Sequence, residues 1–236
     1  MLTFLVFLIW FQTGSQIDAA KLPKTAAKVG EFIPRGWVIE SQIEGDLNRD
    51  SLPDLAVTLV EQMPADADKD NLPESQRAES QRAERQRALL ILFKTADGKF
   101  SRAALANKVL LCTRCGGAFY GMAETPTRVE ISNGVIVVKQ DYGSREITEE
   151  TYRFRFEPET RRFAFIGVDL KSYDRANGQT LKESTNFLTG VKLSAKSQMA
   201  ENTDKEAVAF NTRQKIKSRK RFIEDIAARY NEQEEK

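Results

Sequence analysis

Short apolar runs, each followed by polar turn residues, recur through the middle of the chain. The run 88–93 is continuously apolar, which is typical of a strand buried on both faces. At 152–156, Tyr and Phe alternate with Arg, so this strand is expected to have one buried face and one wet face. The pattern predicts an all-β fold, an antiparallel meander curled into a sandwich, a partial propeller or an open barrel.

Turn residues separate these runs at short intervals. Asp97-Gly98 and Asn133-Gly134 are strong hairpin signals, because both dipeptides suit the backbone of tight turns. Pro158 opens a further turn before the apolar run 163–166. We therefore expect a series of hairpins.

The first apolar run has a different character. Residues 2–11 are almost wholly apolar, and the polar stretch that follows ends at Ala19-Ala20. A bilayer span needs roughly twenty apolar residues, so this run is too short to cross a membrane and fits the core of a signal peptide. We predict a leader over 1–19, no transmembrane span, and a protein that is secreted or periplasmic.

The rest of the chain is expected to be one β domain over 20–200, interrupted by a polar insertion over 62–88. Residues 74–88 repeat a five-residue unit, ESQRA, ESQRA and ERQRA, whose period matches neither a helix nor a strand. Glu and Arg three residues apart are spaced to pair on a transient helix. A solvated loop or frayed helix is the favoured interpretation, and a recognition helix is the alternative.

The charged extension 201–236 is predicted to be helical. A basic run over 215–221 precedes apolar residues that share one face of a helix. Docking of this helix on the β body is favoured. The alternative is an interfacial helix whose basic segment makes a peripheral contact with a membrane or an anionic polymer. The apolar residues are Phe222, Ile223, Ile226, Ala227 and Tyr230.

The composition narrows the candidate chemistry. Lys and Arg number 36 against 34 Asp and Glu, and this balance argues against nucleic acid as a partner. The chain has no histidine. That composition excludes Ser-His-Asp and Cys-His catalysis and His-ligated zinc, since each needs an imidazole.

One loop carries the strongest chemical signal. Oxygen-bearing side chains stand at its first, third, fifth and ninth positions, which are Asp46, Asn48, Asp50 and Asp54. Ca²⁺ takes about six to eight oxygen ligands, and alternate residues of a tight loop can supply them. The twelfth position is Val57 instead of the glutamate of an EF-hand, and the apolar, β-branched flanks indicate a strand-loop-strand unit. A calcium site is the first hypothesis, and a solvated turn without metal is the alternative.

The segment from Gly45 to Val57 resembles the FG-GAP/VCBS-type calcium loop of integrin propellers and many secreted bacterial proteins. The usual pattern is G-D-x-N-x-D-G-x-x-D-L-x-V. The resemblance implies calcium as the cofactor, held by the side chains of Asp46, Asn48, Asp50 and Asp54 and by the backbone carbonyl of Leu52. Ser51 stands where the pattern has Gly. We expect Ser51 to strain the loop, because Gly tolerates positive φ at little cost.

Cys112 and Cys115 are the two cysteines of the chain. In an exported protein, thiols this close are expected to form a disulfide, here structural in role. A zinc ribbon would need two further ligands, and Gly116-Gly117 does not suit the helix of a thioredoxin-like motif, although redox exchange stays an alternative. This CGG segment, together with Tyr142-Gly143-Ser144 and 165–167, resembles a family of secreted bacterial proteins with a single FG-GAP-like loop.

These features together predict an exported, non-catalytic module with a calcium-binding loop, acting as a binding or envelope-associated structural protein. Its expected partner is an envelope protein or glycan. The alternative is a metal-dependent hydrolase of an envelope glycan or phosphate, in which Asp46, Asp50 or Asp54 would act through the metal. The sequence shows no second carboxylate pair placed for that chemistry, which favours the module.

Overall fold

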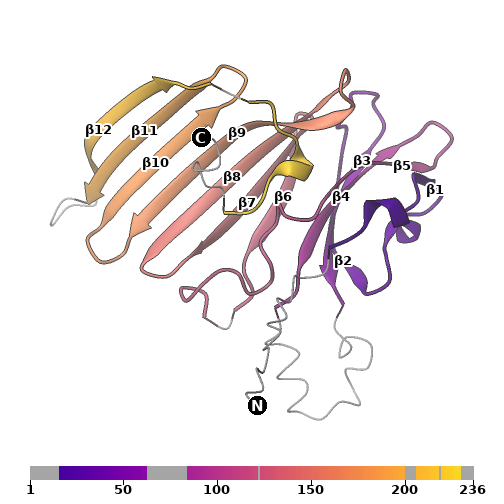
Figure 1. Cartoon of the computed structure of the whole chain (residues 1–236), viewed down its shortest axis with the longest axis horizontal. Coiled ribbons are helices and arrows are strands. Elements are labelled where there is room, and N and C mark those ends of the chain that lie inside the picture. The colour runs from indigo at the N-terminus through magenta and orange to yellow at the C-terminus, as the bar shows by residue number, and fades with distance from the viewer. Residues whose placement is uncertain (1–15, 63–83, 122, 200–205, 218, 230–236) are drawn as a thin grey trace, which may run out of the picture.

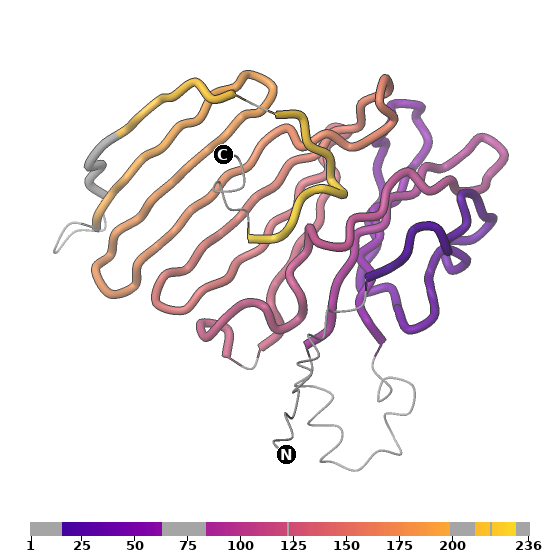
Figure 2. Tube along the Cα trace, viewed as in Figure 1, coloured from indigo at the N-terminus to yellow at the C-terminus, as the bar shows by residue number. Residues whose placement is uncertain are grey.

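The chain folds into two antiparallel sheets that pack together (Figure 1). The computed structural model describes residues 16–62, 84–121, 123–199, 206–217 and 219–229, and Figure 2 follows their path. Strand is the dominant structure, and both sheets are open, with separate edge strands. The predicted all-β meander is therefore confirmed, in the form of two packed sheets.

The smaller sheet has five strands in the order β1-β5-β4-β3-β2. Its strands β2 to β5 follow one another as a meander, and the short β1 joins the free edge of β5. The bounds are β1 Thr25–Ala26, β2 Trp37–Gly45, β3 Asp54–Glu61, β4 Arg87–Lys94 and β5 Phe100–Ala106.

The larger sheet has seven strands in sequence order from β6 to β12. Its far side, β10 to β12, extends away from the smaller sheet in Figure 1. The bounds are β6 Thr127–Ser132, β7 Val135–Gly143, β8 Glu146–Glu157, β9 Arg162–Asp174, β10 Gln179–Asn186, β11 Val191–Met199 and β12 Glu206–Lys215.

The two strongest turn signals both join hairpins. Asn133 and Gly134 have φ of 51° and 76°, the double left-handed conformation that matches the twist of the flanking strands β6 and β7. Gly98, with φ of 82°, donates its N–H to the carbonyl of Thr95 at 2.9 Å between β4 and β5. The predicted hairpins at these positions are confirmed.

Strands β3 and β4 are mostly apolar because both of their faces are covered. On one face, Leu89 and Ile91 join a core shared with the larger sheet, including Tyr152 and Phe154. On the other face, alternate residues such as Leu90 join a second core under the N-terminal segment. Full burial on both sides explains why period-two alternation is absent from these strands.

The N-terminal segment covers the outer face of the smaller sheet. It contains two 3-10 turns, η1 Ala19–Lys21 and η2 Val29–Phe32. Ile17 is buried in the second core, and its backbone N–H and C=O both pair with the side chain of Asn107 at 3.0 Å. Ile17 thus packs in the folded body, although the leader was expected to extend to Ala19.

The predicted C-terminal helix is wrong. Residues 206–215 form β12 beside β11, and beyond it the only helical turn among the described residues is the 3-10 turn η4, Ile223–Asp225. Ile223 and Ile226 are nevertheless buried in the core shared by the two sheets, so the expected docking is confirmed. The segment crosses the larger sheet as the yellow strap in Figure 1.

The basic side chains ahead of this turn also contact the β body. Lys220 pairs with Glu157 at 2.9 Å, and the Arg221 guanidinium lies 5.2 Å from the centroid of the Phe165 ring. An interfacial helix would need an apolar face that is free to contact lipid. Here the segment is largely extended, and its apolar side chains Ile223 and Ile226 are packed in the core. No helix in the described parts of the chain has the length and apolar character required to cross a bilayer.

The polar insertion ends earlier than predicted. Arg87 and Ala88 belong to β4 and are 4% and 0% exposed, so the predicted helical pair of Glu84 with Arg87 is wrong. The strand extends to Arg87 because this residue pairs with Val60 of β3. Most of the repeat, 74–83, lies outside the described residues.

Candidate functional site

The predicted calcium loop connects β2 to β3. Its ends meet at the pair Gly45 and Asp54, the last register position of the two strands. Within the loop, Arg49 and Ser51 have left-handed φ of 67° and 69°, which folds the chain tightly between the strands. Ser51 therefore occupies a conformation that favours glycine, as the sequence pattern predicted.

Side chains of this loop hydrogen-bond to the backbone of the loop itself. The two carboxylate oxygens of Asp46 accept the N–H groups of Arg49 at 2.6 Å and Ser51 at 3.0 Å. The Asn48 side-chain oxygen accepts the N–H of Asp50 at 3.0 Å, and Asp50 accepts the N–H of Leu52 at 2.8 Å. The oxygens of these three side chains therefore face the interior of the loop, where Asp46 and Asn48 are half-buried and Asp50 is exposed.

Asp54 differs from the other predicted ligands because it is fully buried. Its carboxylate accepts N–H groups from Leu47 and from Lys94 at the end of β4, both at 2.9 Å. Burial raises the pKa of Asp54, against the lowering effect of these N–H donors, and the negative charge of Asp50 raises it further. Asp54 ties the loop to β4.

The structure gathers the five predicted ligand positions, Asp46, Asn48, Asp50, Leu52 and Asp54, in one turn between two strands. Its three carboxylates are less tightly grouped: within the described residues, oxygens from all three do not come within 4.8 Å of one another. These residues offer carboxylate, amide and carbonyl oxygens, which are the ligand types that hard cations prefer.

The loop also contacts the larger sheet. Gly45 packs against Ile131 of β6 so closely that a Cβ at this glycine would lie 2.5 Å from the side chain. A hollow of about 350 Å³ opens between the loop and the β6–β7 turn, lined by Asp46, Arg49 and Asn133 among others. The loop therefore joins two strands of the smaller sheet and also contacts the larger sheet.

Cys112 and Cys115 form a disulfide, as predicted. The bend that follows packs against the end of β7: Gly143 donates its N–H to the carbonyl of Gly116 at 2.8 Å. Gly117 has φ of 76°, and a Cβ there would lie 2.6 Å from the carbonyl oxygen of Gly143. The CGG and Tyr142-Gly143-Ser144 segments, which are distant in sequence, thus meet in space.

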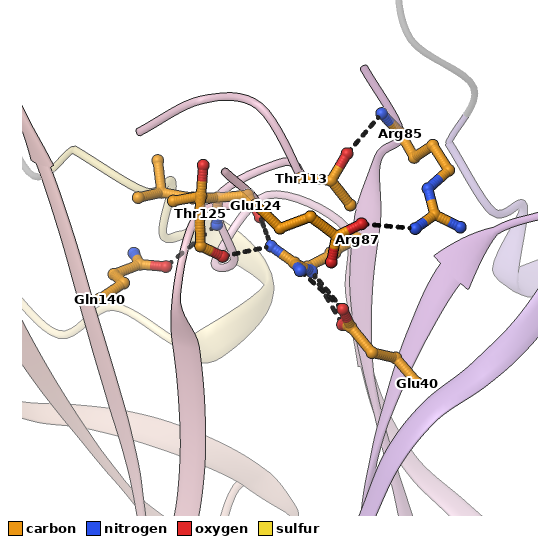
Figure 3. A network of polar contacts seen from close by, with 8 residues as sticks. Glu40, Arg85, Arg87, Thr113, Glu124, Thr125 and Gln140 are labelled. Carbon is orange, nitrogen blue, oxygen red and sulfur yellow. Dashed lines mark hydrogen bonds and ion pairs between the residues drawn. The ribbon is translucent and has the colours of Figure 1, made fainter. Parts of the chain in front are cut away.

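Two buried charged residues escaped the sequence analysis. The first is Arg87, whose guanidinium forms a two-pronged ion pair with Glu40 and also donates to the carbonyl of Thr125 at 3.0 Å (Figure 3). The available signal was its position directly before the apolar run, where alternation places Arg87 on the same strand face as Leu89 and Ile91.

The second is Glu150, which is 1% exposed. Its carboxylate accepts the hydroxyls of Tyr142, at 2.9 Å, and Tyr152, and the backbone N–H of Arg229 at 3.1 Å. Burial raises the pKa of Glu150, although these donors lower it. Glu150 precedes Tyr152 by two residues, so strand alternation placed it on the buried face. The carboxylate fastens the C-terminal strap.

Comparison of the chain with protein-family models, with curated proteins and with solved structures found no match.

Proposed function

We propose that this protein is an exported, non-catalytic module whose loop from Asp46 to Asp54 binds calcium and stabilises a β body that acts as a binding or structural component of the cell envelope. The observation that carries the proposal is the inward orientation of the loop's oxygens. Carboxylates held together at the protein surface repel one another until a cation neutralises them.

The ligands would be the side chains of Asp46, Asn48 and Asp50, the carbonyl of Leu52, and Asp54. Each carboxylate oxygen has two lone pairs, so acceptance of one N–H group leaves capacity for a metal. A bound cation would supply positive charge between strands β2 and β3. Burial raises the pKa of Asp54 and so favours its protonated form. A bound cation would counter this effect by favouring the charged form.

A non-catalytic role is supported by the composition and by the buried carboxylates. The chain lacks the histidine that most acid–base or nucleophilic sites use. Asp54 and Glu150, the buried carboxylates of the described chain, are each occupied by donors from the fold. Export is supported by the apolar run 2–11 and by the disulfide, which persists in oxidising compartments.

The proposal is tested by thermal melts of the exported protein with saturating calcium and with a chelator. Calcium at about one hundred times its dissociation constant stabilises a folded chain by about 2.7 kcal/mol, so the melting temperature is expected to rise. Asp50→Ala should abolish this rise. Asp97→Ala is the matched control, because Asp97 also hydrogen-bonds within an exposed turn, at Thr95.

Equal melting temperatures for the wild-type chain in calcium and in chelator would refute calcium binding. If calcium binding holds, binding of the calcium-loaded protein to cell-wall glycans and envelope proteins identifies the partner class. Hydrolysis of those glycans at a rate abolished by Asp50→Ala would instead favour a metal-dependent hydrolase.

A further inference from the structure

A third potential metal ligand lies beside the two cysteines. The carboxylate of Glu84 and the sulfurs of Cys112 and Cys115 place one ligand atom each within 4.8 Å of the others. Glu84 Oε1 lies 4.0 Å from the sulfur of Cys115. From the sequence, the C-x-x-C pair lacked further ligands, and the fold supplies Glu84 from the segment leading into β4.

This geometry is held by contacts that do not involve the sulfur atoms. Thr113 donates its N–H to the carbonyl of Arg85 at 3.0 Å and accepts the Arg85 N–H at 3.1 Å. Because Arg85 follows Glu84 directly, this pairing anchors Glu84 to the cysteine loop. Thr125 also donates its N–H to the carbonyl of Thr113 at 2.8 Å.

The disulfide itself adds little constraint. It closes a loop between residues separated by three positions, and the entropic contribution of a disulfide falls with the length of the loop that it closes. The backbone N–H of Cys115 also donates to the carbonyl of Cys112 at 3.2 Å. The reduced chain is therefore expected to keep both sulfurs close together and close to Glu84.

The cluster is accessible from solvent. A cleft of about 680 Å³ is lined by Glu84, Lys108, both cysteines, Arg114 and Arg229. Cys112 is 2% exposed, whereas Cys115 is half-buried and faces this cleft. The Arg229 guanidinium donates to the carbonyl of Cys115, and Lys108 and Arg114 add positive charge, which favours the thiolate over the thiol.

We propose that reduction of the Cys112–Cys115 disulfide opens a site for a thiophilic divalent cation such as Zn²⁺, with two thiolates and the Glu84 carboxylate as ligands. Thiolate sulfur and carboxylate oxygen are established zinc ligands, and the fourth position of a tetrahedral site would be left to water. This site is separate from the proposed calcium loop and uses none of its residues.

The chemistry balances with a dithiol as reductant. The dithiol gives two electrons and two protons to the S–S bond, which breaks to two thiols while the dithiol closes to its own disulfide. The cation then displaces one proton from each thiol. In the oxidised chain both sulfurs are bonded to each other, so the thiolate ligands are absent.

Cadmium is a suitable probe, because its bonds to thiolates absorb in the ultraviolet. The full exported chain is reduced with a dithiol, freed of it under anaerobic conditions and titrated with Cd²⁺. We expect a thiolate-to-cadmium band that saturates at one ion per chain, and no band from the oxidised chain. Cd²⁺ added to the reduced chain already loaded with Zn²⁺ should produce the same band by displacing zinc, because thiolates favour the softer cation.

The contribution of Glu84 is tested by Glu84→Gln, which should weaken cadmium binding by about tenfold or more. Glu124→Gln is the matched control, since Glu124 pairs with Arg85 at 2.9 Å outside the sulfur cluster, and should bind as the wild type does. The proposal is overturned if the reduced wild type shows no saturable band, or if Glu84→Gln leaves the affinity unchanged.

Discussion

Glu40 is the extra residue of a β-bulge in β2, and its carboxylate meets the Arg87 guanidinium of β4 at 2.6 Å. The two strands are not neighbours, because β3 lies between them. A bulge turns the side chain of its extra residue away from the regular alternation. Glu40 thereby reaches a cation that would otherwise be buried alone next to the carbonyls of Leu111 and Thr125.

Arg87→Ala is expected to destabilise the fold by about 3 kcal/mol, because it leaves a bulged carboxylate and two carbonyls without their donor. Arg85→Ala is the matched control: Arg85 is two residues away, and its partner Glu124 is 56% exposed. A smaller loss is expected there. Denaturant unfolding measures both, and equal losses would contradict a special role for Arg87.

Much of the sheet architecture follows from local sequence. Two-residue hairpin turns favour residues that tolerate left-handed φ, so Asn133-Gly134 predicted the hairpin. Alternation around Tyr152 and Phe154 predicted which face is buried. The calcium-loop residues were placed correctly between two strands, since an alternating oxygen pattern flanked by apolar, β-branched residues has few other geometries. Calcium itself stays a prediction.

The remaining features depend on tertiary contacts. Ile223 and Ile226 have helical spacing, yet an extended segment with one 3-10 turn buries the same two side chains and pairs its backbone with β9 at Ala164 and Phe222. Residues 206–215 pair with β11, whose edge would otherwise leave backbone groups unpaired. The pairing of Phe222 with β9 is set by a strand far away in the sequence, so the local pattern does not indicate it.

The second prediction concerns Ser51, which has φ of 69°. A left-handed conformation costs a residue with a Cβ about 1–2 kcal/mol, and glycine avoids most of that cost. Since the strain is present without a cation, Ser51→Gly is expected to raise the stability of the chelated protein by up to about 1 kcal/mol. Ser51→Ala, which keeps the Cβ, should show no gain in the same melts. A loss on Ser51→Gly would mean that the serine side chain stabilises the loop.

The third prediction concerns pH and Glu150, whose pKa burial raises above the ordinary value of 4.5. The folded chain then holds this proton more tightly than the unfolded chain does. The contribution of Glu150 to stability is therefore complete below about pH 4.5 and is lost as the pH rises through the raised pKa.

Glu150→Gln should lack this loss. Relative to the variant, the wild type is expected to lose stability as the pH rises above about 4.5 and through the raised pKa of Glu150, by about 1.4 kcal/mol for each unit of pKa difference. Glu149→Gln is the control, because Glu149 pairs with Lys171 at the surface at 2.8 Å. Urea unfolding at several pH values measures the effect. If the difference in free energy of unfolding between the wild type and Glu150→Gln stays constant with pH, the raised pKa of Glu150 is excluded.

The fourth prediction concerns the start of the mature chain. Ile17 is 5% exposed and pairs through its backbone with Asn107. A chain that begins at Ala20 would lose this burial and leave the Asn107 amide unpaired, at a cost of about 2–5 kcal/mol. We therefore expect processing at or before Ile17 instead of after Ala19.

The intact mass of the exported protein shows where the leader is removed. Melts of chains that begin at Gln16 and at Ala20 measure the stability difference, with Asp18→Ala in the longer chain as a control for the exposed cap on Ala20. The prediction is refuted if the exported protein begins at Ala20 and has the same melting temperature as the chain that begins at Gln16.

The last prediction separates the repeat from the strand that follows it. A solvated loop over 74–88 would tolerate deletion, but the last residues of this segment are structural. Gln86 donates its N–H to the Glu61 carboxylate at 2.7 Å, Arg87 pairs with Glu40, and Ala88 is fully buried. Deletion of 74–88 is therefore expected to prevent folding. Deletion of 74–83 removes none of these contacts, and loop closure changes by only about 0.6 kcal/mol when a loop is halved. The shorter deletion should therefore melt close to the wild type. If it also fails to fold, the repeat packs on the body and its interpretation as a solvated insertion is wrong.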